Sequence, residues 1–148
     1  MELQKSWIIR PVEARDVITI ANHRYFNENE SASDKAHYVS WVEAAIVRKA
    51  YLGLVATFGE ETIASAGLVI LDWGPTRGSS SPLRGRIVNV FTASSWRRRG
   101  ISGQLITQLL ADARKCGVGS FCLGATAEAK ALYESLGFKD YGHEMLLK

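Results

Sequence analysis

The sequence predicts a single α/β domain, residues 1–148, with a mixed, mostly antiparallel sheet of about six or seven strands and about four helices. Three observations support this. The chain has 148 residues, the length of one domain with one core, and 47% of them are hydrophobic. Charged residues at 22% and aromatic residues at 9% are unlike a disordered chain. Apolar residues also switch between strand-like runs and helical spacing, so that strands and helices interleave.

The first elements are a short strand and a helix. Trp7–Arg10 is an apolar run that Pro11 stops, which predicts an edge or first strand because proline cannot donate to a ladder. Asp16 then opens a helical pattern, and residues 27–33 are polar and predict a loop. The apolar positions of this helix fall on one face: Val17, Ile20, Ala21 and Tyr25.

A second helix and a hairpin follow. Asp34 can cap a helix that runs to Lys49, and Val39, Val42 and Ile46 form its inward stripe. Tyr51–Phe58 and Thr62–Leu71 are β-prone runs on either side of a Gly59–Glu60 turn, which predicts an antiparallel pair. Residues 72–85 hold two prolines, three glycines and three consecutive serines, so we expect a loop there.

The second half contains the clearest helix. It follows an apolar strand at Ile87–Thr92 and ends at Arg114, Lys115 and Gly117, as helices commonly do. Its apolar residues recur at helical spacing: Ile101, Leu105, Ile106, Leu109, Leu110 and Ala113. The remaining predicted elements are a buried strand at Phe121–Leu123, a helix at Glu128–Leu136 that Gly137 stops, and closing strands at Phe138–Tyr141 and Met145–Leu147.

Charge is shared unevenly between the two halves. Residues 1–74 carry 7 basic and 10 acidic side chains, net −3, whereas residues 75–148 carry 11 and 5, net +6, which gives +3 overall. The two halves are therefore expected to meet different partners. No apolar run is long enough to span a membrane, and the first ten residues lack the apolar core of a signal peptide. Two cysteines make no disulfide framework, so we expect a cytoplasmic protein.

The segment most informative about chemistry runs from Ile87 to Leu110. A strand leads into three consecutive arginines (97–99), then Gly100, and then a helix. A helix N-terminus offers unpaired backbone N–H groups and a partial positive charge, and nearby arginines add full charges. These parts predict an anion cradle for phosphate or pyrophosphate, although a solvated basic loop with turn glycines explains them equally well.

Other phosphate signatures are absent from the sequence. There is no Gly-x4-Gly-Lys-Ser/Thr loop, which excludes the phosphate loop of the common NTPases. Gly117-Val118-Gly119 begins like a dinucleotide fingerprint, but it follows a helix and precedes a strand, so it is a turn.

Two motifs resemble one known family. Residues 97–102, RRRGIS, resemble the Q/R-x-x-G-x-G/A signature of the GNAT superfamily of acetyl-CoA-dependent N-acetyltransferases. Residues 129–138, AKALYESLGF, resemble the family's A-x-x-L-Y-E-x-L-G-F ending, and Asn89–Thr92 stands where the family has its acyl-CoA-binding strand. Two motifs in the right order are more specific than either alone. Together they cover residues 87–140.

The resemblance implies a role for each matching position. The backbone from Arg98 to Gly103 would hold the pyrophosphate of acetyl-CoA, and the strand at Val90–Thr92 would pair with the pantetheine arm and offer an N–H to the thioester oxygen. Tyr133 would protonate the departing thiolate, which suits a phenol that is neutral at pH 7. The implied cofactor-binding residues are Val90, Phe91, Thr92, Arg97, Arg98, Arg99, Gly100, Ile101, Ser102, Gly103 and Thr126.

Two positions depart from the family pattern. Ser102 stands where the second Gly/Ala is usual, and Thr126 stands where many members carry an asparagine that contacts the pantetheine. Both are small polar residues. No general base is evident either, because Asn89 lies near a position where some relatives carry an acid, and asparagine cannot accept a proton. The candidates are Glu28, Glu30 and Asp72, with a water chain as the alternative.

Several residues have simpler explanations than chemistry. His23, His37 and His143 lack metal-ligand spacing, so we expect no metal and treat them as surface or packing residues. Cys122 lies on an apolar strand and is expected to be buried and inert. Trp41 and Trp73 could line a pocket or fill a core.

Three functions are compatible with these observations. The first is transfer of an acetyl group from acetyl-CoA to a primary amine of a small molecule or peptide, by direct attack without an acetyl-enzyme. The acidic first half would favour a cationic acceptor. The second is a non-catalytic acyl-CoA-binding module on the same fold, in which Tyr133 is structural. The third, ranked lowest, is a nucleic-acid-binding module in which Trp96 stacks beside the arginines. We expect neither a nucleic-acid nor a membrane partner, and a homodimer would be usual among the proteins it resembles.

Overall fold

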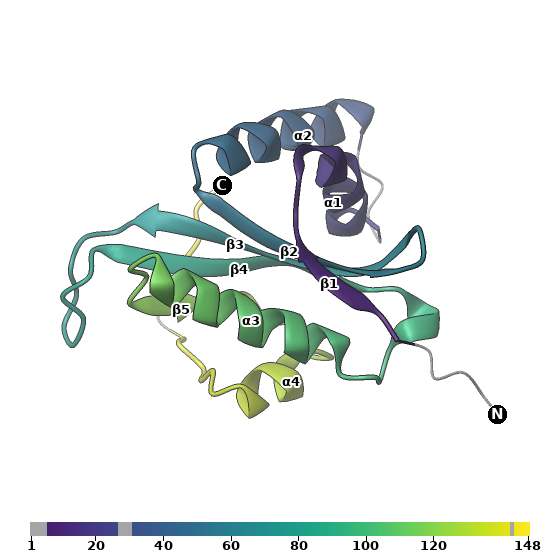
Figure 1. Cartoon of the computed structure of the whole chain (residues 1–148). Helices are drawn as coiled ribbons and strands as arrows, with labels where there is room; N and C mark the ends of the chain where they lie inside the picture. Colours follow the sequence, from purple (N-terminus) through teal and green to yellow (C-terminus); the bar gives the residue numbers. More distant parts are fainter. Residues whose placement is uncertain (1–5, 27–30, 143) are drawn as a thin grey trace.

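A five-stranded sheet with helices on both faces forms the framework of the molecule (Figure 1). The computed structural model describes residues 6–26, 31–142 and 144–148. The strands lie in sequence order, antiparallel from the first to the fourth, while the fifth runs parallel to the fourth. The elements are β1 (Ile8–Pro11), α1 (Val17–Arg24), α2 (Ala32–Val47), β2 (Tyr51–Phe58), β3 (Glu61–Asp72), β4 (Leu83–Thr92), α3 (Ile101–Lys115), β5 (Ser120–Cys122) and α4 (Lys130–Ser135), with 3₁₀ turns η1 (Ala14–Asp16) and η2 (Ser94–Trp96).

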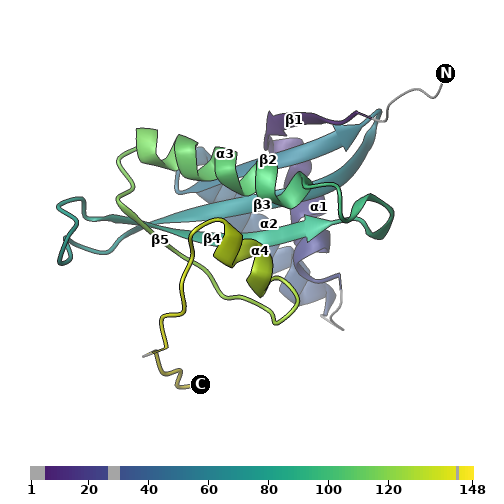
Figure 2. The same ribbon diagram turned by 90° about the horizontal axis from the view of Figure 1, so that it is seen from below.

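The sheet separates two hydrophobic cores. Helices α3 and α4 cover one face, and α1 and α2 cover the other (Figures 1 and 2). The predicted stripe of α3 is confirmed, since Leu105, Ile106 and Leu109 are at most 1% exposed. Because each helical pair buries its stripe against a different face, a ligand bound beside α3 and one bound beside α1 approach the strands from opposite sides.

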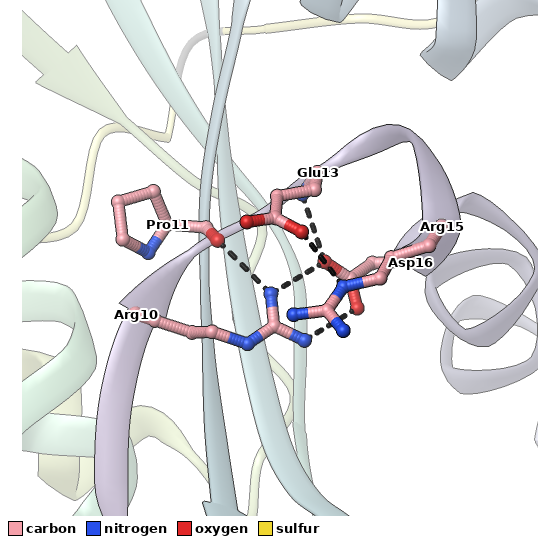
Figure 3. Close-up of polar contacts among 5 residues, drawn as sticks. All are labelled: Arg10, Pro11, Glu13, Arg15 and Asp16. Atoms are coloured by element: carbon pink, nitrogen blue, oxygen red, sulfur yellow. Dashed lines mark hydrogen bonds and ion pairs between the residues drawn. The ribbon is translucent and has the colours of Figure 1, made fainter.

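An ion pair fixes the start of α1 to β1. Both guanidinium nitrogens of Arg10 contact the Asp16 carboxylate, at 2.8 and 2.9 Å, and the backbone N–H of Glu13 donates to the same carboxylate at 2.8 Å (Figure 3). Asp16 is only 5% exposed. The hydrogen bond with Arg10 holds the pKa of Asp16 below its usual range. This bidentate contact sets the direction in which α1 runs over the sheet.

A β-bulge interrupts the pairing of β3 with β4. Val88 lies opposite Gly67 and Phe91 lies opposite Ser65, so two residues of β4 face one residue of β3. Asn89 is one of the two, with a φ of 56° in the left-handed region that non-glycine residues rarely adopt. The bulge turns the side chain of Asn89 toward α2, as its hydrogen bonds show.

Strand β4 outlasts its pairing with β5. The parallel ladder joins only Arg84–Arg86 to Ser120–Cys122. Among the described residues, the remaining stretch of β4, residues 87–92, has no strand on that edge. Its backbone N–H and C=O groups on that side are therefore available to an extended ligand.

The sheet has fewer strands than the sequence predicts. The expected strands at Phe138–Tyr141 and Met145–Leu147 are wrong, because neither segment pairs with another strand in the part of the chain that the structure describes. Met145 is 99% exposed and Leu147 is 96% exposed. Apolar β-prone residues indicate a tendency to extend, but a strand also needs a partner edge, which local sequence cannot supply.

Smaller differences concern element ends. Strand β4 begins at Leu83, four residues earlier than expected, so the preceding loop is shorter. Helix α2 begins at Ala32, and its cap is Ser31, whose hydroxyl accepts from the N–H of Asp34. Helix α4 is confined to six residues. Searching the described residues for a helix long and apolar enough to cross a membrane yields none.

Candidate active site

The N-terminus of α3 is open to solvent and has no side-chain cap. Gly100 occupies the N-cap position with a φ of 79°, and the first bond of the helix runs from the Gln104 N–H to the Gly100 carbonyl at 3.1 Å. The amides of the first turn therefore have no partner within the helix. Arg98 also has a positive φ, 63°. Glycine tolerates this geometry freely, whereas arginine is strained there, which is typical of functional loops.

The three arginines 97–99 directly precede this N-terminus. Arg97 donates from Nε to the Thr92 carbonyl at 3.2 Å, and Arg99 donates to the Ser95 carbonyl at 3.4 Å. All three side chains are exposed, and none forms an ion pair within the described parts of the chain. Their charge is thus available to an anion at the amides of α3.

Trp96 does not have the position that nucleic-acid stacking would need. It is only 6% exposed and packs in the core beside α3, with the Arg99 guanidinium 4.7 Å from its ring centre. Its role in the structure is to anchor the arginine loop. The main observation behind a nucleic-acid-binding module is thereby removed.

The strand end and the helix start are tied together at Ser102. Its hydroxyl lies 2.7 Å from the hydroxyl of Thr92. The departure from glycine or alanine at this position therefore serves a bond within the protein. At the next residue, a Cβ built on Gly103 would lie 3.5 Å from Leu132 of α4, which shows how closely the two helices approach.

Val90 and Phe91 lie on the unpaired stretch of β4 and face opposite sides. Val90 packs against the core beneath α3, while Phe91 stacks on His23 of α1 with ring centres 4.0 Å apart. The strand edge between them therefore has side chains of the α3 side and of the α1 side next to backbone groups without a strand partner.

Tyr133 of α4 is buried on the same face as α3. It is 8% exposed, and its ring lies edge-on to Phe138 at 6.3 Å. Burial raises the pKa of its hydroxyl above the usual 10. The phenol is therefore fully protonated at neutral pH and can donate a proton. It also lines an open groove of about 1220 Å³ between β5, α4 and the C-terminal segment.

Thr126 lies just before α4 and holds its start. Its hydroxyl accepts the N–H of Ala129 at 3.2 Å. The residue is exposed, so a further hydrogen bond to a ligand is sterically open.

A polar network on the opposite face is centred on Asn89. Its amide nitrogen donates to the hydroxyls of Tyr38, at 2.6 Å, and Tyr51, at 3.1 Å, and its amide oxygen accepts from Arg24 at 2.9 Å. Gly67 makes room for this network, because a Cβ there would meet the Tyr51 hydroxyl. Burial raises the pKa of Tyr51, so its hydroxyl stays protonated.

His23 belongs to this face as well. Its Nδ1 lies 2.6 Å from the hydroxyl of the buried Ser65, and burial lowers the pKa of the imidazole to about 4. The ring is therefore neutral at pH 7. Sequence reasoning treated His23 as a surface or packing residue and missed the network altogether, because its members are dozens of positions apart.

Asp72, the described acidic candidate for a general base, is not brought to the bulge. Asp72 pairs with Leu83, at the end of the β3–β4 ladder far from Thr92, and Glu28 and Glu30 lie outside the described residues. Trp73 is 59% exposed under the Arg84 guanidinium, whereas Trp41 stacks on Tyr38. Cys122 is partly exposed on β5. The described residues contain no group of three metal-ligating side chains.

Comparison with solved structures shows the same fold throughout. A predicted acetyltransferase from Clostridium acetobutylicum, solved with acetyl-CoA, superposes with a TM-score of 0.88 at 18% identity, over 97% of this chain and 96% of that one. A GCN5-related N-acetyltransferase from Ralstonia eutropha JMP134 gives a TM-score of 0.85 at 24% identity, over 97% and 99%. For glucosamine-6-phosphate N-acetyltransferase from Arabidopsis thaliana the values are 0.75 and 15%, over 97% and 98%.

Comparison by sequence finds a family but no curated relative. None of the curated proteins matches this chain. The model of the acetyltransferase (GNAT) domain matches residues 26–146, which include the arginine loop, the unpaired stretch of β4 and Tyr133. The resemblance that the two motifs indicate is confirmed, and the chain belongs to the GNAT acetyltransferase family.

Proposed function

We propose that this protein transfers the acetyl group of acetyl-CoA to a primary amine of a small molecule or peptide. The observation that carries the proposal is the unpaired stretch of β4, which runs into the arginine loop and the uncapped N-terminus of α3, while the buried Tyr133 of α4 belongs to the same core as α3. A donor with an anionic end and an extended amide arm fits this arrangement.

The donor is held by groups of three elements. The amides of Ile101, Ser102 and Gly103 and the arginines 97–99 suit the pyrophosphate of acetyl-CoA. The backbone of Val90–Thr92 suits the amides of the pantetheine arm, because extended chains add to free strand edges. Thr126 offers a further hydroxyl just before α4, the helix that carries Tyr133.

The proposed reaction is a direct attack in a ternary complex. The nitrogen of a neutral amine attacks the thioester carbon, the carbonyl becomes an oxyanion, and a backbone N–H of the β4 stretch stabilises that charge. The C–S bond then breaks, the sulfur takes the proton of Tyr133, the nitrogen loses a proton to water or a base, and the Tyr133 phenolate regains a proton from water. The products are an N-acetyl amine and CoA thiol. Positioning two substrates contributes much of the rate in such reactions.

A panel of primary amines tests the proposal. Thiol release from acetyl-CoA is measured with each amine, and acetyl-CoA binding is measured by calorimetry. Turnover with at least one amine supports the proposal. Tight acetyl-CoA binding with no turnover would instead support the non-catalytic acyl-CoA-binding module. Absence of both binding and turnover would contradict both functions.

The acceptor itself is proposed as an amine, and the charge split of the sequence favours a cationic one. That preference rests on the net charge summed over residues 1–74. The residues that line the bulge give a more local criterion.

A further inference from the structure

The guanidinium of Arg24 lies beside the β4 bulge, on the face of the sheet that α1 and α2 cover. Arg24, in the last turn of α1, donates from Nη1 to the Asn89 side chain at 2.9 Å. Its guanidinium also covers the Tyr38 ring at 4.4 Å from the ring centre. A hydrogen bond on one side and a ring on another hold this cation in a defined place.

The charge of Arg24 has no carboxylate partner within the described residues. The ion pairs there involve Arg10, Arg15 and Lys130. Arg24 is exposed, and one of its five N–H donors is used by Asn89. A guanidinium that is fixed in place and still has free donors is well suited to bind a carboxylate or phosphate through two parallel hydrogen bonds.

The position of Arg24 relative to the reaction follows from the two faces of the sheet. Under the proposed function, α3 and α4 hold the donor on one face of β4, so the amine must approach from the face of α1 and α2 (Figure 1). Asn89, which Arg24 contacts, lies on the stretch of β4 that has no strand on its β5 side, and Val90–Thr92 follow it directly. An acceptor that reaches this stretch therefore passes the guanidinium.

We propose that Arg24 selects amines that carry an anionic group, a carboxylate or a phosphate, a few bonds from the nitrogen. The inference rests on the proposed function, because it assigns the substrate class of the same site. It reverses the cationic preference that the net charge of the first half suggests. Charges more than about 10 Å away are largely screened at ordinary salt, whereas a contact charge is not, so the nearest cation dominates.

A hollow on the side of α1 and α2 supplies the competing prediction. It is an open space of about 390 Å³ lined by Tyr25, Asp34, His37, Tyr38 and Trp41. Aromatic faces and a carboxylate would suit a cation there. Arg24 and this hollow therefore predict opposite orders of preference in one experiment.

The experiment uses matched pairs of amines that differ by the anionic group. One pair is phenylalanine and phenethylamine, which tests a carboxylate, and the other is glucosamine 6-phosphate and glucosamine, which tests a phosphate. For each pair the ratio of kcat/KM is measured in the wild type and in Arg24→Gln. We expect the wild type to favour the anionic member of at least one pair and Arg24→Gln to lower that ratio by about 10- to 100-fold, the range for a charged hydrogen bond.

Two further variants separate charge from structure. Arg24→Lys keeps the charge without the fork and should retain part of the preference. Arg48→Gln is the matched control, because Arg48 also lies over an aromatic ring, that of Trp41, but makes no contact with Asn89. A purely structural role of Arg24 would slow both members of a pair equally and leave the ratio unchanged. Comparing ratios also cancels the different basicities of the paired amines.

The outcomes are distinct. Turnover of amines without any anionic preference, or a preference that survives Arg24→Gln, overturns the inference and leaves the proposed function standing. Preference for polycationic amines overturns it in favour of the Tyr25–Trp41 hollow. If the wild type turns over none of the amines, the proposed function is overturned together with the inference.

Discussion

At the scale of single residues, burial determines the protonation state of the groups nearest the proposed reaction. Tyr133 is buried in an apolar core and His23 is packed against Phe91, and in each case burial disfavours the charged form. Tyrosine is thereby kept as an acid and histidine is kept neutral. Both states persist across the neutral pH range.

Replacing Tyr133 tests the acid. Tyr133→Phe removes the hydroxyl but keeps the ring that packs against Phe138. We expect kcat to fall by about 10²-fold or more, the usual contribution of a general acid, with acetyl-CoA affinity unchanged. Stopped assays of thiol release and calorimetry of acetyl-CoA measure the two quantities. Tyr141→Phe, at a residue that is 77% exposed, is the control. An undiminished kcat in Tyr133→Phe would remove the acid role.

His23 predicts a dependence of stability on pH. Its pKa is about 4 in the folded protein and about 6.5 unfolded, so the unfolded chain binds more protons between these values. The contribution of the neutral His23 side chain to the free energy of unfolding is complete above pH 6.5. It is lost as the pH falls toward 4, and the loss is about 2–3 kcal/mol. Urea unfolding from pH 7 to pH 4.5 measures this loss. His23→Gln should flatten the profile in that window, and an identical slope in the variant would show that other groups cause it.

At the scale of elements, the start of α3 combines requirements that usually conflict. A stable helix N-terminus favours an acidic or capping residue, yet this one has Gly100 as its cap and three arginines before it. The local cost to the helix is understandable if the first turn must receive an anion. The element is thus locally suboptimal for folding where it is suited to binding.

A charge substitution separates these two requirements. Ser102→Asp places a carboxylate in the first turn of α3, where it interacts favourably with the helix dipole, by about 0.3–1 kcal/mol. The same carboxylate repels a pyrophosphate, so the Kd for acetyl-CoA should rise at least about 10-fold. Thr107→Asp, on the exposed side of the same helix, should leave the Kd unchanged. Equal affinity in Ser102→Asp and the wild type would place the phosphates elsewhere.

Local patterns predicted the elements that local chemistry determines. The α3 stripe and the arginine loop could be read directly, because helical periodicity and a contiguous motif lie within some twenty residues of sequence. The contacts of Asn89 could not. Tyr38 lies 51 positions away and Tyr51 38 positions away, and only the bulge brings their hydroxyls to one amide. The two closing strands failed for the same reason, since pairing depends on a distant edge.

At the scale of the whole molecule, the two sides proposed for the substrates are built differently. The proposed donor side draws on β4, α3 and α4, which are close in sequence and share one core. The acceptor side depends on α1 and α2, which pack on a smaller core, and on the Arg10–Asp16 pair that ties α1 to β1 (Figure 3). The two motifs that resemble the family lie on the first side.

Because the two sides lie on opposite faces, a mutation on one side and a ligand on the other should change the free energy of unfolding additively. Asp16→Ala leaves the Arg10 guanidinium without its buried partner and should lower the free energy of unfolding by about 2–4 kcal/mol. Acetyl-CoA at 100 times its Kd should raise that free energy by about 2.7 kcal/mol in both proteins. The measurement is urea unfolding of wild type and variant, with and without ligand. If the sites are independent, the ligand raises the free energy of unfolding equally in both proteins, within about 0.5 kcal/mol. Arg15→Ala removes an exposed ion pair on the same turn and is the control. A ligand increment that shrinks in Asp16→Ala would mean that the start of α1 and the donor site are energetically coupled across the sheet.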